Sequence, residues 1–422
     1  MSSREWGTFS FHSMSQMDQI DKDLSEQTAE FESAARAIYS GRRILVTGGG
    51  GSIGRNLIMK LARFAPLRIA ALDKDENAIY ELQQDLLMQR VPIPVEPHVA
   101  DIRDTWRLQS ICQAFAPEVI FHAAAYKHVS LMELHPSEAV LGNVMGTKNL
   151  LDIVAGFGAE RFVFVSADEA GNPGTVMGAT KRIGEMLVQS ASQSGRLRAA
   201  SVRFGNILGS RGSVGPQFLR PITEGGPLTI TDPNVARCFI TMEQAIQAIL
   251  TAGSVAHRGE IFVADIDGPR SVDELAREMI LLAELNPGKD IEARIVGVRH
   301  GEGLAEELGC RSKDLAKSRF KGLSVVPSLN FDDRKLMQHI NHLVQAARSV
   351  DPGAIQSVLE VMGIGYTRIT RSPPINVCLS SPSTPAQGPV PSPSLPQPLP
   401  FVEAQQVSTG TNGLGPKANV LP

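Results

Sequence analysis

The chain has 422 residues, of which 42% are hydrophobic and 20% charged, so it can form one large or two modest domains of ordinary globular composition. Its formal net charge of -3 argues against a nucleic-acid-binding surface. The four cysteines lie far apart with no CxxC pair, which argues against a metal site or a disulfide framework and fits a reducing cytoplasm.

The first 40 residues form an N-terminal extension. They hold no basic stretch followed by an apolar segment, so we expect no secretory signal. No apolar run approaches the ~20 residues of a membrane helix, so we expect no membrane insertion. Residues 18–40 carry apolar side chains at helical spacing, which predicts an amphipathic helix packed on the domain or on a partner subunit.

Short apolar runs alternate with helical stretches in residues 41–210. The apolar runs are RRILVTG, LRIAALD, EPHVADI, EVIFHAAA, RFVFVSAD and RAASVRFGN, and helices are expected near 53–65, 76–90, 104–115 and 136–156. This order indicates crossover units and a parallel sheet buried on both faces. We therefore predict an α/β fold with a Rossmann-type doubly wound parallel sheet.

Residues 211–370 are less regular and predict a smaller α/β substrate-binding domain. Strands are expected in PLTIT, EIFVADI and IEARIVGV, and helices near 242–254, 271–284 and 332–348; the core sheet can receive some of these segments. Residues 371–422 are rich in Pro and Ser, which predicts a disordered tail, although its PxxP-like pieces could instead bind a partner.

A glycine-rich turn, TGGGGSIG, follows the first predicted strand and opens a helix. In such a turn the first glycine bends the chain, the second lets the backbone approach a pyrophosphate, and the third allows close packing of helix and strand. The phosphates then meet the positive end of the helix dipole. The residues predicted to bind the dinucleotide here are Gly48, Gly51, Ser52, Ile53 and Gly54.

Acidic side chains follow the next two predicted strands. Asp73 lies 19 residues after Gly54, where a carboxylate can accept hydrogen bonds from the adenosine ribose hydroxyls and repel a 2′-phosphate. NAD is therefore favoured over NADP, although Lys74 weakens that preference because a cation tolerates the phosphate. Asp101 is placed to meet the adenine ring, unless it is an incidental acid.

Five strings occur in the order TGGGGSIG, FHAAAYKHVSLME, SADEAGNPGTVMGATKR, RFGNILGSRGSVGPQF and RHGEGLAEEL. Together they resemble the nucleotide-sugar 4,6-dehydratases of bacterial polysaccharide biosynthesis, in the extended short-chain dehydrogenase/reductase superfamily. The most similar group acts on UDP-N-acetylglucosamine. The resemblance covers about residues 40–368. Some members carry membrane helices and an extra N-terminal domain, whereas we expect this chain to be a soluble form.

The resemblance implies a lyase that retains its cofactor. NAD takes hydride from C4 of the sugar, and the resulting 4-ketone acidifies the C5 proton. A base removes that proton, an acid helps the 6-hydroxyl leave as water, and the hydride returns to C6.

Two departures from the family pattern fall in the expected active site. The lysine that binds the nicotinamide ribose is Lys181, but the usual tyrosine four residues earlier is Met177, and no YxxxK occurs in the chain. A branch of the UDP-N-acetylglucosamine dehydratases also carries methionine here, which can serve only as a packing surface. In the family string Ser-Thr-Asp-Lys, the threonine is replaced by Ala167 and the lysine by Glu169.

The resulting acidic pair resembles that of dTDP-glucose 4,6-dehydratase, which implies Asp168 as general acid and Glu169 as general base. Ser166 cannot replace the hydroxyl missing at Ala167, because neighbouring side chains on a strand point to opposite faces. Alternatively, Asp168 caps a turn and Glu169 is solvated. The base for the 4-hydroxyl is either Asp168 or a water ordered by Lys181.

Residues after the fourth predicted strand are expected beside the nicotinamide. Ala123 and Tyr126 are assigned to the cofactor, and Lys127 and His128 to the sugar, with simple packing as the alternative. A proton relay through His128 is a further hypothesis. Asn143 matches a superfamily asparagine that shapes the helix beside the lysine, and we assign it to the cofactor site.

The nucleotide end of the substrate requires groups that bind phosphate. Arginine forks suit phosphate oxygens, although any one of them could be a plain surface charge. The residues that the resemblance assigns to diphosphate or uridine are Asn206, Arg211, Arg237, Arg299 and Glu302. Replacements at His300, Gly303 and Ala305 change the family string around the last two.

The leading interpretation is an NAD-retaining nucleotide-sugar 4,6-dehydratase acting on UDP-N-acetylglucosamine, with no metal, as a cytoplasmic homo-oligomer (a dimer or higher). One alternative is a nucleotide-sugar epimerase or oxidoreductase. Another is a catalytically impaired protein that binds NAD and a nucleotide sugar and regulates a pathway, which the replacements at Ala167 and Met177 favour.

Overall fold

The main sheet of the protein contains nine strands among the described residues of a computed structural model. The structure describes residues 31–193, 195–265, 268–298, 301, 303, 315–318, 320 and 322–368. The strands of this sheet are β1 (Arg43–Thr47), β2 (Arg68–Asp73), β3 (Val95–Val99), β4 (Val119–His122), β5 (Arg161–Val165), β6 (Arg198–Arg203), β11 (Glu260–Ala264), β14 (Ala316–Lys317) and β15 (Leu323–Val326).

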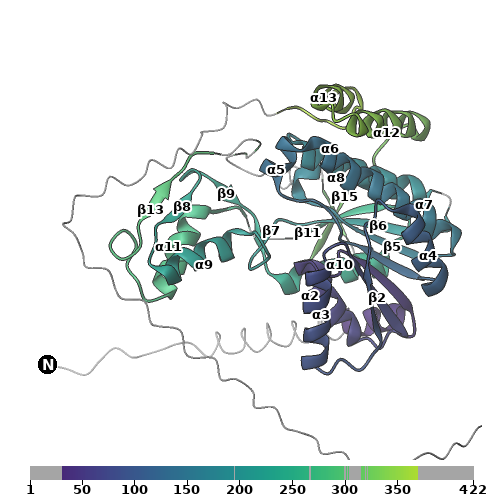
Figure 1. Cartoon of the computed structure of the whole chain (residues 1–422), viewed down its shortest axis with the longest axis horizontal. Coiled ribbons are helices and arrows are strands. Elements are labelled where there is room, and N and C mark those ends of the chain that lie inside the picture. The colour runs from purple at the N-terminus through teal and green to yellow at the C-terminus, as the bar shows by residue number, and fades with distance from the viewer. Residues whose placement is uncertain are drawn as a thin grey trace, which may run out of the picture. The chain divides into compact units, whose positions relative to one another are not determined.

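These strands lie in the order β14-β15-β11-β6-β5-β4-β1-β2-β3 (Figure 1). All neighbours from β3 to β11 are parallel, whereas β15 is antiparallel to β11 and β14 is antiparallel to β15. The part of the order that reads 3-2-1-4-5-6 is that of a dinucleotide-binding fold, whose ligand site lies at the carboxyl ends of the strands. The predicted fold class is confirmed.

Helices cover both faces of this sheet, which explains why its central strands are apolar throughout. In Figure 1, α2 (Ser52–Ala62), α3 (Glu76–Met88) and α10 (Met242–Val255) lie on one face. The helices on the other face are α4 (Thr105–Phe115), α5 (Val129–Leu134), α6 (Pro136–Ala139), α7 (Gly146–Gly156), α8 (Val176–Ser192), α12 (Asp333–Arg348) and α13 (Pro352–Val361).

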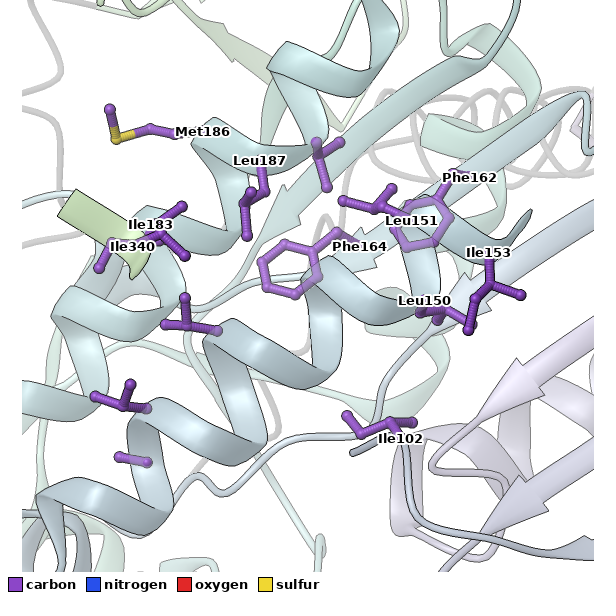
Figure 2. Close-up of a cluster of buried hydrophobic side chains, with 14 of the residues drawn as sticks. Ile102, Leu150, Leu151, Ile153, Phe162, Phe164, Ile183, Met186, Leu187 and Ile340 are labelled. Atoms are coloured by element: carbon purple, nitrogen blue, oxygen red, sulfur yellow. The ribbon is translucent and has the colours of Figure 1, made fainter. Parts of the chain in front are cut away.

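Figure 2 shows the apolar cluster on the second face, where Phe162 and Phe164 of β5 meet side chains of α7 and α8. Ile340 of α12 lies in the same cluster, so the C-terminal helices belong to the core of this face. Burial of this apolar surface holds α8 against β5, and α8 carries Met177 and Lys181.

A smaller group of elements packs around its own apolar cluster, which includes Phe218, Leu228 and Ile280. Its helices are α9 (Val214–Glu224) and α11 (Val272–Leu282). Its strands are β8 (Leu228–Ile230), β9 (Ala236–Arg237), β12 (Arg270–Ser271) and β13 (Ala293–Ile295), and β7 (Asn206–Ile207) pairs with β10 (Phe239–Ile240). The domain boundary at residue 210 stays a prediction.

Several elements differ from the sequence-based expectations. The helix expected over 136–156 is α6, a π-helical turn (Val140–Met145) and α7 in succession. The sequence did not predict α9, which contains Pro221, or α13. Of the expected N-terminal helix, residues 31–39 are helical and the rest lie outside the described residues, as does the predicted tail 371–422.

Candidate active site

The turn between β1 and α2 requires glycine at specific positions. Gly48 has φ of +69°, and a Cβ there would lie 2.7 Å from the backbone nitrogen of Ala124. A Cβ on Gly54 would lie 2.1 Å from the carbonyl oxygen of Gly48. Gly51 precedes α2 and provides no capping side chain, so the first N–H groups of the helix are available to an anion.

Asp73, at the end of β2, is oriented by the same turn. One carboxylate oxygen accepts a hydrogen bond from the N–H of Gly50 at 3.1 Å, and the other accepts one from the N–H of Asp75 at 3.1 Å. The ammonium of Lys74 lies 3.9 Å from the centre of the Tyr126 ring and also contacts its hydroxyl. The carboxylate is thus fixed, while the neighbouring cation is held by an aromatic ring.

A cavity of about 160 Å³ lies at the carboxyl ends of β1, β2 and β4. Seven residues predicted to bind the cofactor line it: Gly48, Gly51, Asp73, Asp101, Ala123, Tyr126 and Asn143. Ser52, Ile53, Gly54 and Lys181 are not among its lining residues. Arg103 and Gly142 also line it and were not predicted; their signal is position, because each lies within two residues of a predicted one.

Asp101 is bound by an arginine at the rim of this cavity. Its carboxylate accepts hydrogen bonds from Nε and Nη2 of Arg103, at 2.9 and 2.7 Å, and Arg103 also donates to Glu138. Burial alone would raise the pKa of Asp101, but the hydrogen bonds and charge of Arg103 outweigh it and lower the pKa. The carboxylate is therefore charged at neutral pH and held in one orientation.

Asn143 lies in the π-helical turn and orders the segment after β4. Its amide oxygen accepts the N–H of Tyr126 at 2.8 Å, and its amide nitrogen donates to the Tyr126 carbonyl and to the hydroxyl of Thr180 on α8. A Cβ on Gly142 would lie 2.8 Å from the Tyr126 ring, so this ring packs directly on the backbone of the turn. The turn places Asn143 between β4 and α8, as π-helical turns often do at functional sites.

Lys181 lies on the second turn of α8 and is buried. Its ammonium donates a hydrogen bond to the carbonyl of Val165 at 2.9 Å and lies 5.0 Å from the centre of the Phe164 ring. Burial lowers the pKa of Lys181 to about 8, while the carboxylates of Glu169 and Glu185 raise it in part. Met177, one turn earlier, is buried in the apolar cluster.

The acidic pair lies in a short 3-10 turn, Asp168–Ala170, two residues beyond the end of β5. Asp168 is 4% exposed and Glu169 is half-buried, so the two carboxyl groups lie in different surroundings. A Cβ on Gly178 of α8 would lie 2.8 Å from the carbonyl oxygen of Glu169, so this turn packs closely on α8. The Ser166 hydroxyl donates to Glu185 of α8 at 2.7 Å.

Loop 208–213 connects the predicted substrate residues to the glycine turn. The backbone N–H of Arg211 donates to the Ser52 hydroxyl at 2.9 Å, and the ammonium of Lys127 donates to the Arg211 carbonyl at 2.8 Å. A Cβ on Gly212 would lie 2.5 Å from the His128 ring. The structure therefore brings Ser52, Lys127, His128 and Arg211 together.

The predicted arginines hold protein acceptors. The Arg211 guanidinium pairs with Glu81 of α3, and Nη2 of Arg237 donates to the carbonyl of Gly303 at 2.9 Å. Asn206 starts β7, where its N–H donates to the Cys238 carbonyl at 2.7 Å. Arg299 and Glu302, predicted to bind the nucleotide, lie outside the described residues.

The sheet order, the glycine turn and the fixed carboxylate at the end of β2 define a Rossmann-type dinucleotide-binding protein. Residues 44–327 match the family described as "Polysaccharide biosynthesis protein", and the chain belongs to this family. The resemblance noted in the sequence is thereby confirmed.

Curated relatives and a solved structure extend this result. The chain is 42% identical over 269 residues to the capsular polysaccharide biosynthesis protein CapD of Staphylococcus aureus, covering 63% of this chain and 45% of CapD. It is 30% identical to a UDP-N-acetylglucosamine 4,6-dehydratase (inverting) of Campylobacter jejuni, covering 75% of this chain and 92% of the relative. The X-ray structure of Pen from Bacillus thuringiensis superposes with a TM-score of 0.63 at 30% identity, covering 69% and 90% of the two chains.

The first two curated relatives are longer than the region they share with this chain. The chain spans about half of their length, 45% and 50%.

None of the helices within the described ranges combines the length and hydropathy needed to cross a membrane. Within the same ranges, no group of three His, Cys, Asp or Glu side chains is arranged to bind a metal ion.

Proposed function

We propose that the protein is an NAD-retaining nucleotide-sugar 4,6-dehydratase that acts on UDP-N-acetylglucosamine. The observation that carries this proposal is the position of Asp168 and Glu169. They lie two residues beyond β5 in a turn that packs on α8 near Lys181, and the carboxyl ends of neighbouring strands line the dinucleotide cavity. Acid, base and cofactor site therefore belong to one edge of the sheet.

The residues of the cavity fit NAD. Glycine at 48 and 54 lets the turn pack tightly against backbone atoms of Ala123, Ala124 and the turn itself, and the N-terminus of α2 is uncapped by side chains. The two oxygens of Asp73 are oriented by backbone N–H groups and retain capacity for the ribose hydroxyls. When bound, NAD would accept and return the hydride; Lys181 would bind its nicotinamide ribose.

The acidic pair supplies the proton transfers of the elimination. In such an elimination the general acid must be protonated and the general base ionised. The buried Asp168 donates to the leaving 6-hydroxyl, and the half-buried Glu169 removes the C5 proton. The 4-hydroxyl passes its proton to Asp168 or to a water ordered by the Lys181 ammonium, because the Met177 thioether cannot exchange protons.

The substrate side is proposed to hold the nucleotide diphosphate. Lys127 and His128 adjoin loop 208–213, which supports a role for them in binding the sugar or diphosphate. Asn206, Arg211 and Arg237 lie on the segments around it, and Arg299 and Glu302 complete the proposed set. A homo-oligomer, a dimer or larger, is part of the same proposal and is measured by light scattering of the purified chain.

One incubation tests the proposal against its alternatives. Purified protein with UDP-N-acetylglucosamine should give a product lighter by one water, without net NADH, by mass spectrometry and absorbance. An isomer of unchanged mass would instead indicate an epimerase, and accumulating NADH an oxidoreductase. Intact sugar that binds tightly would indicate the regulatory binding protein, which the residues Ala167 and Met177 favour.

A further inference from the structure

A buried ion pair lies beneath the end of β5. The Glu185 carboxylate of α8 is fully buried and accepts two hydrogen bonds from the Arg203 guanidinium of β6, from Nε and Nη2, each at 2.6 Å. The same carboxylate accepts the Ser166 hydroxyl at 2.7 Å, and Arg182 lies 3.6 Å from it. The pair thus links α8, β5 and β6 in the protein interior.

Two side chains of α8, one helical turn apart, bind consecutive residues of the chain. Lys181 donates to the carbonyl of Val165, and Glu185 accepts from the hydroxyl of Ser166. One residue, Ala167, separates these contacts from the acidic pair. Contacts from α8 therefore fix Val165 and Ser166, the residues that connect β5 to the acidic pair.

The energetics of buried ion pairs suggest why such a pair is present. Removing two charges from water costs roughly as much as their attraction returns, so apolar residues of similar volume would give comparable stability. A bidentate arginine–carboxylate pair does, however, fix the relative orientation of its two groups. On this argument the pair contributes to the positioning of Glu185 rather than to the free energy of unfolding.

We infer that Glu185, held by Arg203, is a positioning residue that acts through Ser166 to fix the acidic pair at the end of β5. This inference rests on the proposed function, because it assigns the pair a catalytic geometry to maintain. Glu185 itself touches neither substrate nor cofactor in this scheme. Its effect is transmitted through the Ser166 hydroxyl, so that contact can be removed while the Glu185–Arg203 pair is kept.

The test compares Ser166→Ala with Ser192→Ala. Ser192 is also buried and lies on α8, but its hydroxyl donates to the carbonyls of Leu197 and His257, remote from the acidic pair. Both variants lose one buried hydroxyl group, and Ser166→Ala keeps the Glu185–Arg203 pair intact. Glu185→Gln is less suitable, because it leaves the buried charge of Arg203 uncompensated.

Two readouts are measured: turnover, and hydrogen–deuterium exchange of peptides covering 166–176. Ser166→Ala should exchange faster in this segment and lose about tenfold in kcat, as expected for a small misplacement of reacting groups, with KM and NAD affinity unchanged. Ser192→Ala should show neither change, although its thermal stability falls comparably.

Ser166→Ala with wild-type exchange, or with the kcat of Ser192→Ala, would overturn the inference. A wild-type protein that forms no dehydrated product would overturn the proposed function instead. In that case the exchange comparison still decides whether Ser166 fixes the segment, since it requires no catalysis.

Discussion

The cofactor cavity and the substrate-side loops differ in what their polar groups hold before any ligand binds. In the cavity, backbone N–H groups orient Asp73, and Arg103 orients Asp101, so both carboxylates are preset. On the substrate side, the guanidinium groups of Arg211 and Arg237 bind protein acceptors. A cofactor can thus enter a formed site, whereas a diphosphate bound at Arg211 and Arg237, as proposed, would displace their present partners. Preset groups lower the cost of binding.

Gly54→Ala is expected to have the largest effect on cofactor binding. The new methyl would meet the Gly48 carbonyl oxygen at 2.1 Å, so the turn must open and NAD binding is expected to be lost. Gly156→Ala is the matched control, because a Cβ there meets no atom within 4 Å. Calorimetric titration with NAD compares the two. Retained affinity in Gly54→Ala would contradict a phosphate-binding role for this turn.

Glu169→Gln should remove the base while sparing the cofactor. Loss of a general base costs ~10²- to 10⁴-fold in rate, so loss of the C5 proton should nearly stop while NAD affinity stays at the wild-type value. Glu160→Gln is the control, since Glu160 is exposed and precedes the opposite end of β5. Exchange of the C5 proton with solvent, followed by NMR, measures the effect. Unchanged exchange would remove Glu169 from the mechanism.

Titration of Lys181 should make both turnover and the free energy of unfolding depend on pH. Its pKa is lowered to about 8 from 10.5, chiefly by burial, so its charge is lost as pH rises through about 8, and turnover should fall about tenfold per pH unit above that value. Between these two pKa values the unfolded chain binds more protons, so the free energy of unfolding should rise with pH, by at most about 1.4 kcal/mol per unit.

Lys181→Met removes this titrating group, and His122, whose pKa the Lys181 charge also lowers, titrates at about 3, far below the pH range of the test. The difference in unfolding free energy between wild type and variant, from denaturant titrations at pH 7 to 11, should change in the window from about 8 to 10.5. A difference independent of pH would contradict the lowered pKa.

Asp73→Asn tests the predicted preference for NAD over NADP. Loss of the charge should weaken NAD by about tenfold and reduce the discrimination against NADP, since the repulsion of a 2′-phosphate is removed. Asp75→Asn serves as the control: Asp75 caps α3, and asparagine caps helices about as well. Equal effects of both variants on NAD affinity would contradict the assigned role of Asp73.

Arg211 gives the smallest expected effect. If this guanidinium must leave Glu81 to bind diphosphate, Arg211→Ala should raise KM for the nucleotide sugar by about threefold to tenfold, whereas Glu81→Gln should leave it equal or lower. Arg220→Ala is the control, because Arg220 is exposed and pairs with Glu224 one turn away on α9. An unchanged KM in Arg211→Ala would contradict a role for Arg211 in binding the diphosphate.

The sequence predicted the cofactor side well because its determinants are local. Strand, turn and helix follow one another over 47–54, and acids at strand ends reach the same edge of the sheet without knowledge of distant contacts. Gly48, Gly51, Asp73, Asp101 and Asn143 accordingly line the cavity. Arg103 was missed because its role depends on its fork reaching Asp101 and Glu138.

The rest could not be read from local pattern. The contacts of Ser166 with Glu185 and of Arg237 with Gly303 join residues 19 and 66 positions apart, and nothing in the sequence marks these pairs. The π-helical turn interrupts a helix whose apolar spacing predicts none. α9 contains Pro221, and an interior proline disfavours a helix, so the local pattern does not predict one there.

The proposed dehydration requires that hydride return within one bound sugar while a carboxyl pair removes water. UDP-N-acetylglucosamine carrying deuterium at C4 tests this directly by mass spectrometry and NMR of the product. We predict a sugar lighter by one water with the deuterium at C6 and a solvent proton at C5. Deuterium remaining at C4, or transferred to released NADH, would contradict it.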